Sequence, residues 1–430
     1  MTPQIKQRIE QIRWGEVPEG YKKTKVGIVP EEWETTRFKN KFSRLMRKNT
    51  EGNTNVLTIS AQYGLVNQEE FFNKSVASDD KTNYFLLYQG EYAYNKSYSN
   101  GYPFGAIKKL DKYEKGIVSP LYICFSANKE NKCPEFYLQY FEAGGMNSEI
   151  QAFAQEGARN HGLLNISIDD FFNAILVEPS AQEQEKIAEI LATQDRVIEL
   201  CEKKVEQLKK LKKVFLQKMF PKPGAAVPEW RFPGFTDAWE QRKVGELLTE
   251  RNDQAPMSDE YPLMAFIANE GVSPKGERYD RSALVNDTAG KLYKKTEFGD
   301  FIYSSNNLET GSIGLNKYGK ASISPVYSIF QSTGLADSDF IGRRFVRKDF
   351  INAMVKWRQG VIYGQWRIHE SDFIKIEVAV PSVEEQRKIG VFLDNLDNLI
   401  TLHQRKCDEE KQKKKALMQL LLTGIVRVKV

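Results

Sequence analysis

The stretch Pro179-Ser180-Ala181-Gln182-Glu183-Gln184-Glu185-Lys186-Ile187 recurs later in the chain as Pro381-Ser382-Val383-Glu384-Glu385-Gln386-Arg387-Lys388-Ile389, at an offset of 202 residues. Each copy ends a run that looks like a β-strand, and the offset continues without a gap as far as Gln217 and Gln419. A repeat with so long a period indicates duplicated domains rather than a solenoid. The chain therefore contains two copies of one plan.

The segments that follow the two copies carry seam residues at alternating spacings of four and three. This period predicts a coiled coil rather than an ordinary amphipathic surface helix. Polar seam positions such as Gln194 and Glu410 indicate a marginal pair that also needs outside partners. The expected helix-pair and subunit interface consists of Ile187, Leu191, Ile198, Val205, Leu208, Ile389, Leu393, Leu396 and Ile400.

Charge predicts the direction in which the two helices pair. Residues 183–199 contain five acidic and two basic side chains, whereas residues 200–218 contain two acidic and seven basic ones. The second helix repeats this gradient. Antiparallel pairing sets each acidic half against a basic half, so it is the expected arrangement. The same gradient complements the helix dipoles and would also stabilise each helix alone.

Weaker repeats precede each helix, and between them short strand patterns alternate with helical patches. Gly90-Glu91-Tyr92-Ala93-Tyr94, for example, corresponds to Gly299-Asp300-Phe301-Ile302-Tyr303. We expect a pseudo-twofold α+β protein in which two duplicated domains are joined by two long antiparallel coiled-coil helices. The expected parts are an N-terminal helical arm (1–24), a first domain called head 1 (25–178), a first long helix (179–220), a linker (221–238), a second domain called head 2 (239–380), a second long helix (381–424) and a tail (425–430).

The N-terminal arm carries an apolar stripe of Ile5, Ile9 and Ile12. In a pseudo-twofold chain the second long helix ends near the start of head 1. The stripe is then expected to pack against the end of that helix. The alternative is a frayed basic arm, because chain termini are often disordered. The expected partners of the stripe are Leu417, Leu420, Leu421 and Ile425.

Composition limits the classes of function. A length of 430 residues gives room for two or three domains with cores of their own, and the net charge of +5 is compatible with a polyanionic partner. The four cysteines show no CxxC spacing, which suits a reducing compartment. No apolar run approaches membrane-spanning length, and no secretory core follows the first residues. We expect a cytoplasmic protein with no membrane association.

Motifs for chemistry are weak. Gly314-Leu315-Asn316-Lys317-Tyr318-Gly319-Lys320 fits the first seven positions of a phosphate-binding P-loop, but Ala321 stands where Mg²⁺ binding needs Ser or Thr. A hairpin turn with basic residues is the favoured interpretation. The three histidines are isolated in the sequence, which disfavours a metal site or a catalytic pair. We therefore expect no catalytic residue, no metal and no cofactor in this chain.

Polar and aromatic segments occupy matched positions in the two heads. Asn, Gln, Arg and Lys side chains pair with base edges in the major groove, and Ser, Tyr and backbone N–H groups hold phosphates. For any individual residue, a solvated hairpin loop is the alternative. The candidate DNA-binding residues are Tyr94, Asn95, Lys96, Asn100, Arg159 and Asn160 in head 1, and Ser304, Ser305, Asn306, Asn307, Lys317, Arg358, Gln359, Gln365 and Arg367 in head 2.

Over essentially its whole length the chain resembles the specificity subunits of type I restriction–modification systems. The resemblance rests on the two Pro-Ser-x-x-Glu-Gln-x-Lys-Ile helix starts and on Val29–Glu34 and Phe232–Glu240 at the entry to each head. It implies two target-recognition domains that each read half of a split asymmetric DNA sequence. It also implies two methyltransferase subunits on the helices and a restriction subunit that translocates DNA. S-adenosylmethionine, ATP and Mg²⁺ would then belong to those partners, and no base-contacting residue carries over.

Two rival interpretations belong to other classes. A coiled-coil scaffold that joins two protein-binding domains predicts no salt-dependent affinity for DNA. An autonomous DNA-modifying enzyme is disfavoured by the missing motifs. Two heads on a twofold rod suit a duplex, whose equivalent groove faces recur about every 34–36 Å.

Overall fold

The computed structural model describes residues 2–60, 62–72, 80–99, 101–156, 164–274, 291–306, 308, 310–362 and 365–429. The chain divides into two compact units. Unit 1 comprises Met1–Cys201 and Lys406–Val430, and unit 2 comprises Glu202–Arg405. Each unit thus contains one head, the start of one long helix and the end of the other. The boundaries expected between heads, helices and linker stay predictions.

The two long helices, α7 (Ala181–Lys218) and α12 (Val383–Leu421), begin at the repeated Pro-Ser motif. In both copies the serine hydroxyl accepts a backbone N–H three residues on, from Glu183 at 3.3 Å and from Glu385 at 3.4 Å. A serine at this position satisfies one of the donors that a helix start leaves free. The motif is therefore a helix cap.

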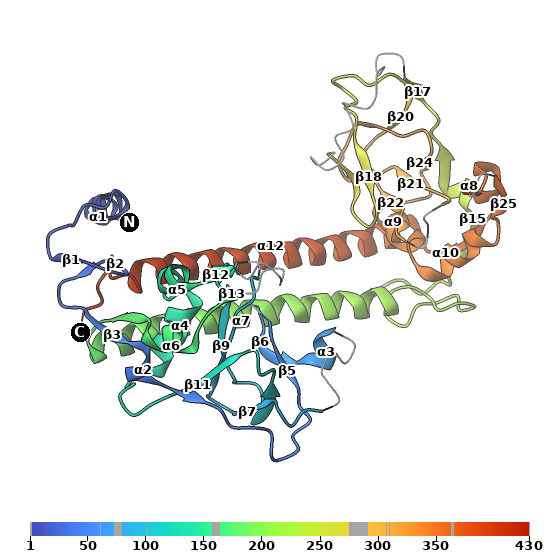
Figure 1. Ribbon diagram of the computed structural model, residues 1–430. Coiled ribbons are helices and arrows are strands. Elements are labelled where there is room, and N and C mark those ends of the chain that lie inside the picture. Colours follow the sequence, from blue (N-terminus) through green and yellow to red (C-terminus); the bar gives the residue numbers. More distant parts are fainter. Residues whose placement is uncertain are drawn as a thin grey trace. The chain divides into compact units, whose positions relative to one another are not determined.

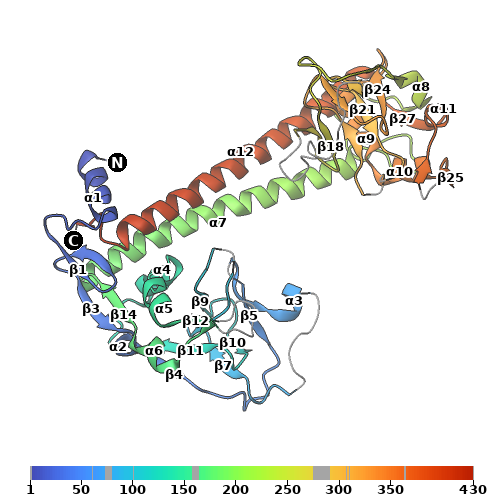
Figure 2. The same ribbon diagram turned by 45° about the horizontal axis from the view of Figure 1, so that its top comes forward.

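The helices pair in antiparallel fashion inside each unit, as Figures 1 and 2 show. In unit 1, Asp195 near the start of α7 forms a 2.6 Å ion pair with Lys414 near the end of α12. In unit 2, Lys212 near the end of α7 pairs with Asp397 near the start of α12. The two contacts join repeat-equivalent residues. The antiparallel direction that the charge gradient predicted is confirmed.

Head 1 is built around a four-stranded antiparallel sheet in the order β4-β11-β8-β9. Its aromatic core continues onto Ile187 and Leu191 of α7 and Leu421 of α12, so the head packs directly on the helix ends. Each such buried aliphatic side chain contributes roughly 1.5–3 kcal/mol. The elements of head 1 are β3 (Glu34–Arg37), α2 (Phe38–Lys41), β4 (Phe42–Leu45), β5 (Leu57–Ser60), β6 (Gly64–Asn67), α3 (Gln68–Phe72), β7 (Phe85–Tyr88), β8 (Tyr92–Asn95), β9 (Ala106–Lys109), β10 (Lys115–Val118), β11 (Ile123–Ala127), α4 (Pro134–Glu142), α5 (Asn147–Phe153), β12 (Gln155–Glu156), β13 (Leu164–Asn165), α6 (Ile168–Asn173) and β14 (Ile175–Glu178).

Head 2 repeats the sheet, in the equivalent order β16-β24-β21-β22. Its core likewise includes Met219 and Phe220 after α7 and Ile389 and Leu393 of α12. The α+β duplication expected from the repeat is confirmed. The elements of head 2 are β15 (Glu240–Lys243), α8 (Val244–Leu247), β16 (Leu248–Glu250), β17 (Gln254–Ala255), β18 (Ala265–Ile267), β19 (Gly271–Ser273), β20 (Tyr293–Thr296), β21 (Phe301–Tyr303), β22 (Ile313–Leu315), β23 (Ala321–Ile323), β24 (Ser328–Ser332), α9 (Ser338–Phe345), α10 (Lys348–Val355), β25 (Gln359–Ile362), β26 (Gln365–Arg367), α11 (Glu370–Phe373) and β27 (Glu377–Val380).

The first and last strands of each head pair with each other. β3 pairs with β14 in head 1, and β15 pairs with β27 in head 2, both antiparallel. Each head thus begins and ends at one place, beside the cap of a long helix. This pairing explains why the strand-like run before the Pro-Ser motif belongs to the repeat.

The N-terminal arm, α1 (Pro3–Arg13) with β1 (Tyr21–Thr24) and β2 (Gly27–Pro30), contacts the segment after α12. Arg8 donates to the carbonyl of Ile425 at 2.6 Å, and the Tyr21 hydroxyl donates to the carbonyl of Gly424 at 2.7 Å. The expected nearness of the two chain ends is therefore seen. The isoleucine stripe, however, is only half-buried, and α1 has no buried residue. Polar contacts thus join the arm to this segment, and the expected packing of the stripe stays a prediction.

None of the described helices is long and apolar enough to cross a membrane.

Candidate nucleic-acid interface

Four of the predicted contact residues, Asn100, Arg159, Asn160 and Asn307, lie outside the described residues, and only the backbone is described for Gln359 and Gln365. Of the others, Tyr94, Asn95 and Lys96 in head 1 and Ser304, Ser305 and Asn306 in head 2 lie at the end of β8 or β21, whereas Lys317 follows β22 at the opposite end of the sheet. In the described part of the chain, no group of three or more His, Cys, Asp or Glu side chains is arranged to hold a metal ion. The candidate interface is a set of loops.

In head 1 the structure joins the predicted segment around Lys96 to β13, a strand far away in the sequence. Asn95 ends β8, and Lys96 begins the loop that leads to β9. The backbone N–H of Leu164 in β13 donates to the carbonyl of Lys96 at 3.0 Å. The β12–β13 hairpin, which flanks residues 157–163, is thus attached to the β8–β9 loop. We call this pair of segments loop cluster 1.

Head 2 joins the equivalent segments by a different bond. The backbone N–H of Ile368, just after β26, donates to the Ser305 hydroxyl at 3.0 Å. The Tyr303 hydroxyl donates to the carbonyl of the same Ile368 at 3.3 Å. The hairpin of β25 and β26 is therefore attached to the loop after β21, with Arg358 before it and the exposed Arg367 within it. We call this pair of segments loop cluster 2.

Tyr94 does not belong among the contact residues. Its side chain is fully buried, its ring stacks on Phe171 at 5.0 Å, and its hydroxyl donates to the carbonyl of Phe104 at 2.7 Å. Burial raises the pKa of its hydroxyl. Ser304 is also buried. The prediction that Tyr94 and Ser304 contact DNA is wrong for the same reason in both cases. Each residue is buried in the head, at the end of the central strand or directly after it, and the loop begins only beyond it.

Lys317 is exposed but already engaged. Its ammonium lies 2.8 Å from a carboxylate oxygen of Asp394 on α12 and 3.1 Å from one of Asp339 on α9. Arg343 of α9 also pairs with Asp394, and with Asp397 at 2.9 Å. Burial works against the charge of Lys317, but the hydrogen bonds to the two carboxylates prevail and raise its pKa. The residue predicted to touch phosphate instead attaches head 2 to the helix. The P-loop-like stretch around it forms the turn after β22.

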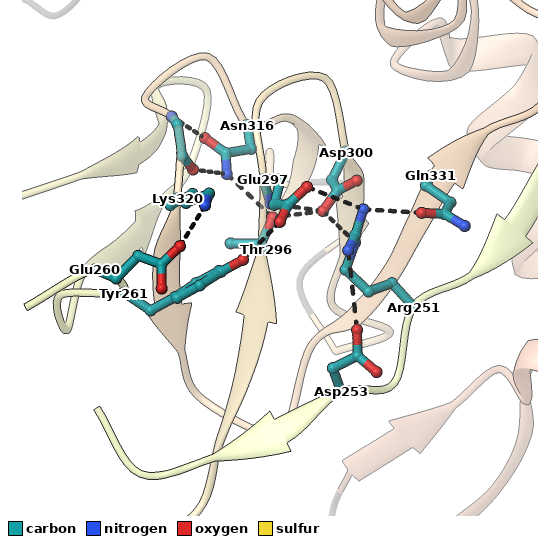
Figure 3. A network of polar contacts seen from close by, with 11 residues as sticks. Arg251, Asp253, Glu260, Tyr261, Thr296, Glu297, Asp300, Asn316, Lys320 and Gln331 are labelled. Atoms are coloured by element: carbon teal, nitrogen blue, oxygen red, sulfur yellow. Dashed lines mark hydrogen bonds and ion pairs between the residues drawn. The ribbon is translucent and has the colours of Figure 1, made fainter. Parts of the chain in front are cut away.

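The strand that leads into each loop cluster starts at a turn whose carboxylate accepts a backbone N–H and binds an arginine. We call it the acidic turn, and the sequence analysis did not predict it. In head 2 the buried Asp300 accepts the backbone N–H of Glu297 at 2.7 Å and pairs with Arg251 at 2.9 Å. Figure 3 shows Arg251 between Asp300, Asp253 and Gln331. Burial raises the pKa of Asp300 although the turn and Arg251 oppose that shift.

Head 1 contains the same turn with Glu91 in place of Asp300. Glu91 accepts the backbone N–H of Tyr88 at 2.7 Å and receives both terminal nitrogens of Arg47, at 3.0 and 3.1 Å. The available signal was the repeated Gly-acid-aromatic triplet at residues 90–92 and 299–301. The arginine partners stand more than forty residues upstream in the chain, so no local pattern marks them.

One end of head 2 contains a cavity of about 570 Å³. Gly314 of β22 and Val346 after α9 line its apolar side, and the ion pairs of Lys317 and Arg343 line the other. The lining residues come from β22, α9 and the start of α12 among other segments, and all of them belong to unit 2.

The expected helix interface is largely buried. Ile187, Leu191, Val205, Leu208, Ile389, Leu393 and Leu396 are buried, whereas Ile198 and Ile400 are partly exposed. Sequence reasoning missed a second contact at each helix start, where a buried glutamate receives an arginine. Arg427 binds Glu183 at 2.7 and 2.8 Å, and Arg231 binds Glu385 at 2.7 and 2.7 Å.

Comparisons with known proteins agree with this architecture. Residues 236–410 match the family described as the type I restriction modification DNA specificity domain. A putative type I restriction enzyme MjaX specificity subunit of Methanocaldococcus jannaschii is 22% identical over 427 residues, which cover 96% of this chain and 97% of that protein. The type I restriction enzyme MjaVIII specificity subunit of the same organism is 25% identical over 304 residues, covering 65% and 68% of the two chains.

Two solved structures show the same fold. The type I restriction–modification S subunit from M. genitalium has a TM-score of 0.51 at 15% identity, over 90% of this chain and 96% of its own. A chain from a study of assembly and conformational transition in a type I R-M system has a TM-score of 0.51 at 15% identity, covering 93% and 99%. The duplicated heads and the paired helices define a two-headed fold. Residues 236–410 match the DNA specificity domain, and nearly the whole chain is similar to a type I restriction enzyme specificity subunit.

Proposed function

We propose that this DNA-recognition subunit reads a bipartite asymmetric site, one half with each head. Loop clusters 1 and 2 carry the proposal, because each head brings two polar segments together at the same end of the same sheet. Their sequences differ while the acidic turns behind them are repeated, as expected of two domains that read different bases. Direct reading of base edges in a groove needs such projecting polar side chains.

We further propose that the chain does no chemistry itself and acts in the cytoplasm with partner subunits. Two modification subunits would methylate adenine, and a restriction subunit would cleave DNA with the use of ATP. S-adenosylmethionine, ATP and Mg²⁺ would be bound by those partners. The long helices supply a surface for them, because each exposes apolar side chains away from the seam. These are Ile190, Val197, Leu200, Leu211 and Val214 on α7 and Val391, Leu399 and Leu402 on α12.

A domain exchange tests the independence of the two heads. Residues 239–380 are replaced with the second domain of another family member, and methylated adenines in host DNA are mapped after co-expression with the modification subunit. We expect one half of the methylated sequence to change and the other half to stay the same. A change in both halves would refute independent reading.

The scaffold alternative is tested by DNA binding. A specificity subunit in its complex should lose affinity for DNA steeply as salt rises, since each neutralised phosphate releases counterions. A scaffold that joins two protein-binding domains should show no salt-dependent affinity. Co-purification without any DNA binding would therefore favour the scaffold.

A further inference from the structure

The loop between β8 and β9, which belongs to loop cluster 1, is held by a hydrogen-bonded network of three side chains. Lys108 of β9 is buried, and its ammonium reaches the carboxylate of Glu142 at the end of α4. It also lies 3.1 Å from the hydroxyl of Tyr102, in the middle of the loop between β8 and β9. The Tyr102 hydroxyl donates to the other carboxylate oxygen of Glu142.

Each member of this network needs the other two. A buried ammonium group is costly unless it is paired and hydrogen-bonded, and the pair with Glu142 meets only part of that need. The ring of Tyr102 adds to it, because the ammonium of Lys108 lies 4.7 Å from the ring centroid. Burial and the neighbouring Glu142 raise the pKa of Tyr102, so its hydroxyl stays protonated and donates.

The network fixes the side chain of Tyr102, and the backbone of Tyr102 is in turn hydrogen-bonded to the rest of the loop. Its N–H donates to the carbonyl of Ser99 at 2.8 Å, and its carbonyl accepts the N–H of Ser99 at 3.2 Å. The loop closes on itself at this pair, next to Tyr98, whose side chain is 64% exposed. At the base of the loop the backbone of Gly105 packs closely on that of Asn95. A Cβ at position 105 would lie only 2.2 Å from the carbonyl oxygen of Asn95. Tyr102 therefore holds the outer part of the loop.

The described residues of head 2 contain no such network at the equivalent positions. Lys108 pairs with Ala93 in the sheet of head 1, and the equivalent residue beside Ile302 in head 2 is Gly314. By the alignment of α4 with α9, Val346 stands where head 1 has Glu142. Gly314 and Val346 both line the cavity of head 2. At these two described positions head 2 therefore lacks the side chains of the network, and two domains that read different bases are expected to differ beside their loops.

We infer that Tyr102, Glu142 and Lys108 are positioning residues that set the specificity of head 1, by holding the loop with Lys96 and Tyr98 in one conformation against DNA. The inference rests on the proposed function, because it assumes that this loop faces the half-site. The three residues touch no base themselves. Loss of the Tyr102 hydroxyl lets the loop adopt other conformations, and wrong bases are then accepted in one half-site.

The test compares two tyrosine hydroxyls of head 1. Tyr102→Phe removes the hydroxyl at the loop. Tyr137→Phe is the matched control, because the Tyr137 hydroxyl also donates to a glutamate, Glu178, which pairs with Lys41 at 3.0 Å. Glu142→Gln is a second loop variant that keeps the side-chain size. Each full chain is assembled with its modification subunits, and the methylated sites are mapped by sequencing.

With Tyr102→Phe and Glu142→Gln we expect discrimination to fall roughly fivefold at one or more positions of the head 1 half-site, the equivalent of about one net hydrogen bond. The other half-site should be read as in the wild type, and Tyr137→Phe should change neither half. Equal fidelity in all three variants, or equal relaxation by Tyr137→Phe, would overturn the inference.

Hydrogen exchange of residues 96–105 in the unassembled chain provides a readout that needs no DNA. Tyr102→Phe should speed exchange in this segment at least several-fold, and Tyr137→Phe should not. If the wild-type complex methylates no bipartite site, the proposed function fails, whereas unchanged exchange in Tyr102→Phe refutes the positioning role on its own.

Discussion

In both units an arginine binds a buried glutamate at the start of a long helix, but the exposure of the arginine differs between the two units. In unit 2 the carboxylate of Glu385 and the side chain of Arg231 are 1% and 12% exposed. In unit 1 the carboxylate of Glu183 is fully buried, but Arg427 is 33% exposed and also pairs with Glu32 at 2.8 Å. The comparison separates what the repeat maintains, an arginine on a buried glutamate, from what it leaves free to change.

The heads diverge more than the helix starts. Both keep the sheet order and the acidic turn before the central strand. Beside the loop, head 1 places the network of Lys108, Glu142 and Tyr102, and head 2 leaves a cavity bounded by ion pairs to α12. The duplicated chain has thus retained the sheet order and the acidic turn, and it has varied the contacts beside the loops, including the ion pairs from head 2 to α12.

The largest effect is expected at Glu385. Glu385→Ala leaves Arg231 buried without its carboxylate, and removal of one partner from a buried pair costs about 3–5 kcal/mol. Glu183→Ala should cost less, about 2 kcal/mol, because Arg427 retains Glu32 and partial exposure to water. Urea unfolding followed by tryptophan fluorescence measures both. The exposed Glu185 is the control, since Glu185→Ala should change little. An equal loss at Glu183 and Glu385 would contradict the comparison.

The second contrast concerns the arginines at the acidic turns. Arg251→Met should cost about 3 kcal/mol, because it leaves the buried Asp300 unpaired, whereas Arg47→Met should cost about 1 kcal/mol at a more exposed pair. The pKa of Asp300 is raised, so its protonated form is favoured in the folded state. The cost of Arg251→Met should therefore shrink as the pH falls toward 3.8, the ordinary value for this carboxyl group. A cost that grows toward acid pH would contradict this assignment.

The third contrast lies in the helix seam. Gln194 donates to the carboxylate of Glu410 at 2.5 Å, whereas the repeat-equivalent residues in unit 2 are the buried Leu396 and Leu208. Gln194→Leu should destabilise unit 1, since it removes the closer of the two donors, Gln194 and Lys413, to the Glu410 carboxylate. The double variant with Glu410→Leu should recover most of that loss, because it gives unit 1 the apolar seam of unit 2. Additive losses in a double-mutant cycle would show that the two side chains do not act as a pair.

The smallest effect separates two lysines that the sequence treated alike. Lys96→Ala should lower the slope of log affinity against log salt by about one unit if its ammonium meets a phosphate. Lys317→Ala should leave that slope nearly unchanged and instead destabilise unit 2, because Lys317 is paired with Asp339 and Asp394. Salt titrations of DNA binding by the assembled complexes measure both slopes. An equal drop for both lysines would return Lys317 to the interface.

These contrasts show what the sequence could predict and what it could not. The heptad period and the charge gradient act along one helix, so the pairing of α7 with α12 and its direction followed from local pattern. The match of Gly90–Tyr94 to Gly299–Tyr303 predicted the duplicated strands for the same reason. The partners of Lys317 and Asp300 did not follow, because each lies on another element that only the tertiary fold brings near. Tyr94 was misassigned because its polar neighbours in the sequence lie beyond the end of a strand that is itself buried.

The division of the chain also has a consequence for synthesis. Unit 2 is one continuous segment, Glu202–Arg405, whereas unit 1 needs Lys406–Val430 to complete the structure that Met1–Cys201 begins. The ribosome makes the intervening stretch of roughly 200 residues in about 10–40 s, at ~5–20 residues per second. During that interval Ile187 and Leu191 lack Leu421, and Glu183 lacks Arg427. The half of the protein that begins first is therefore expected to be finished last.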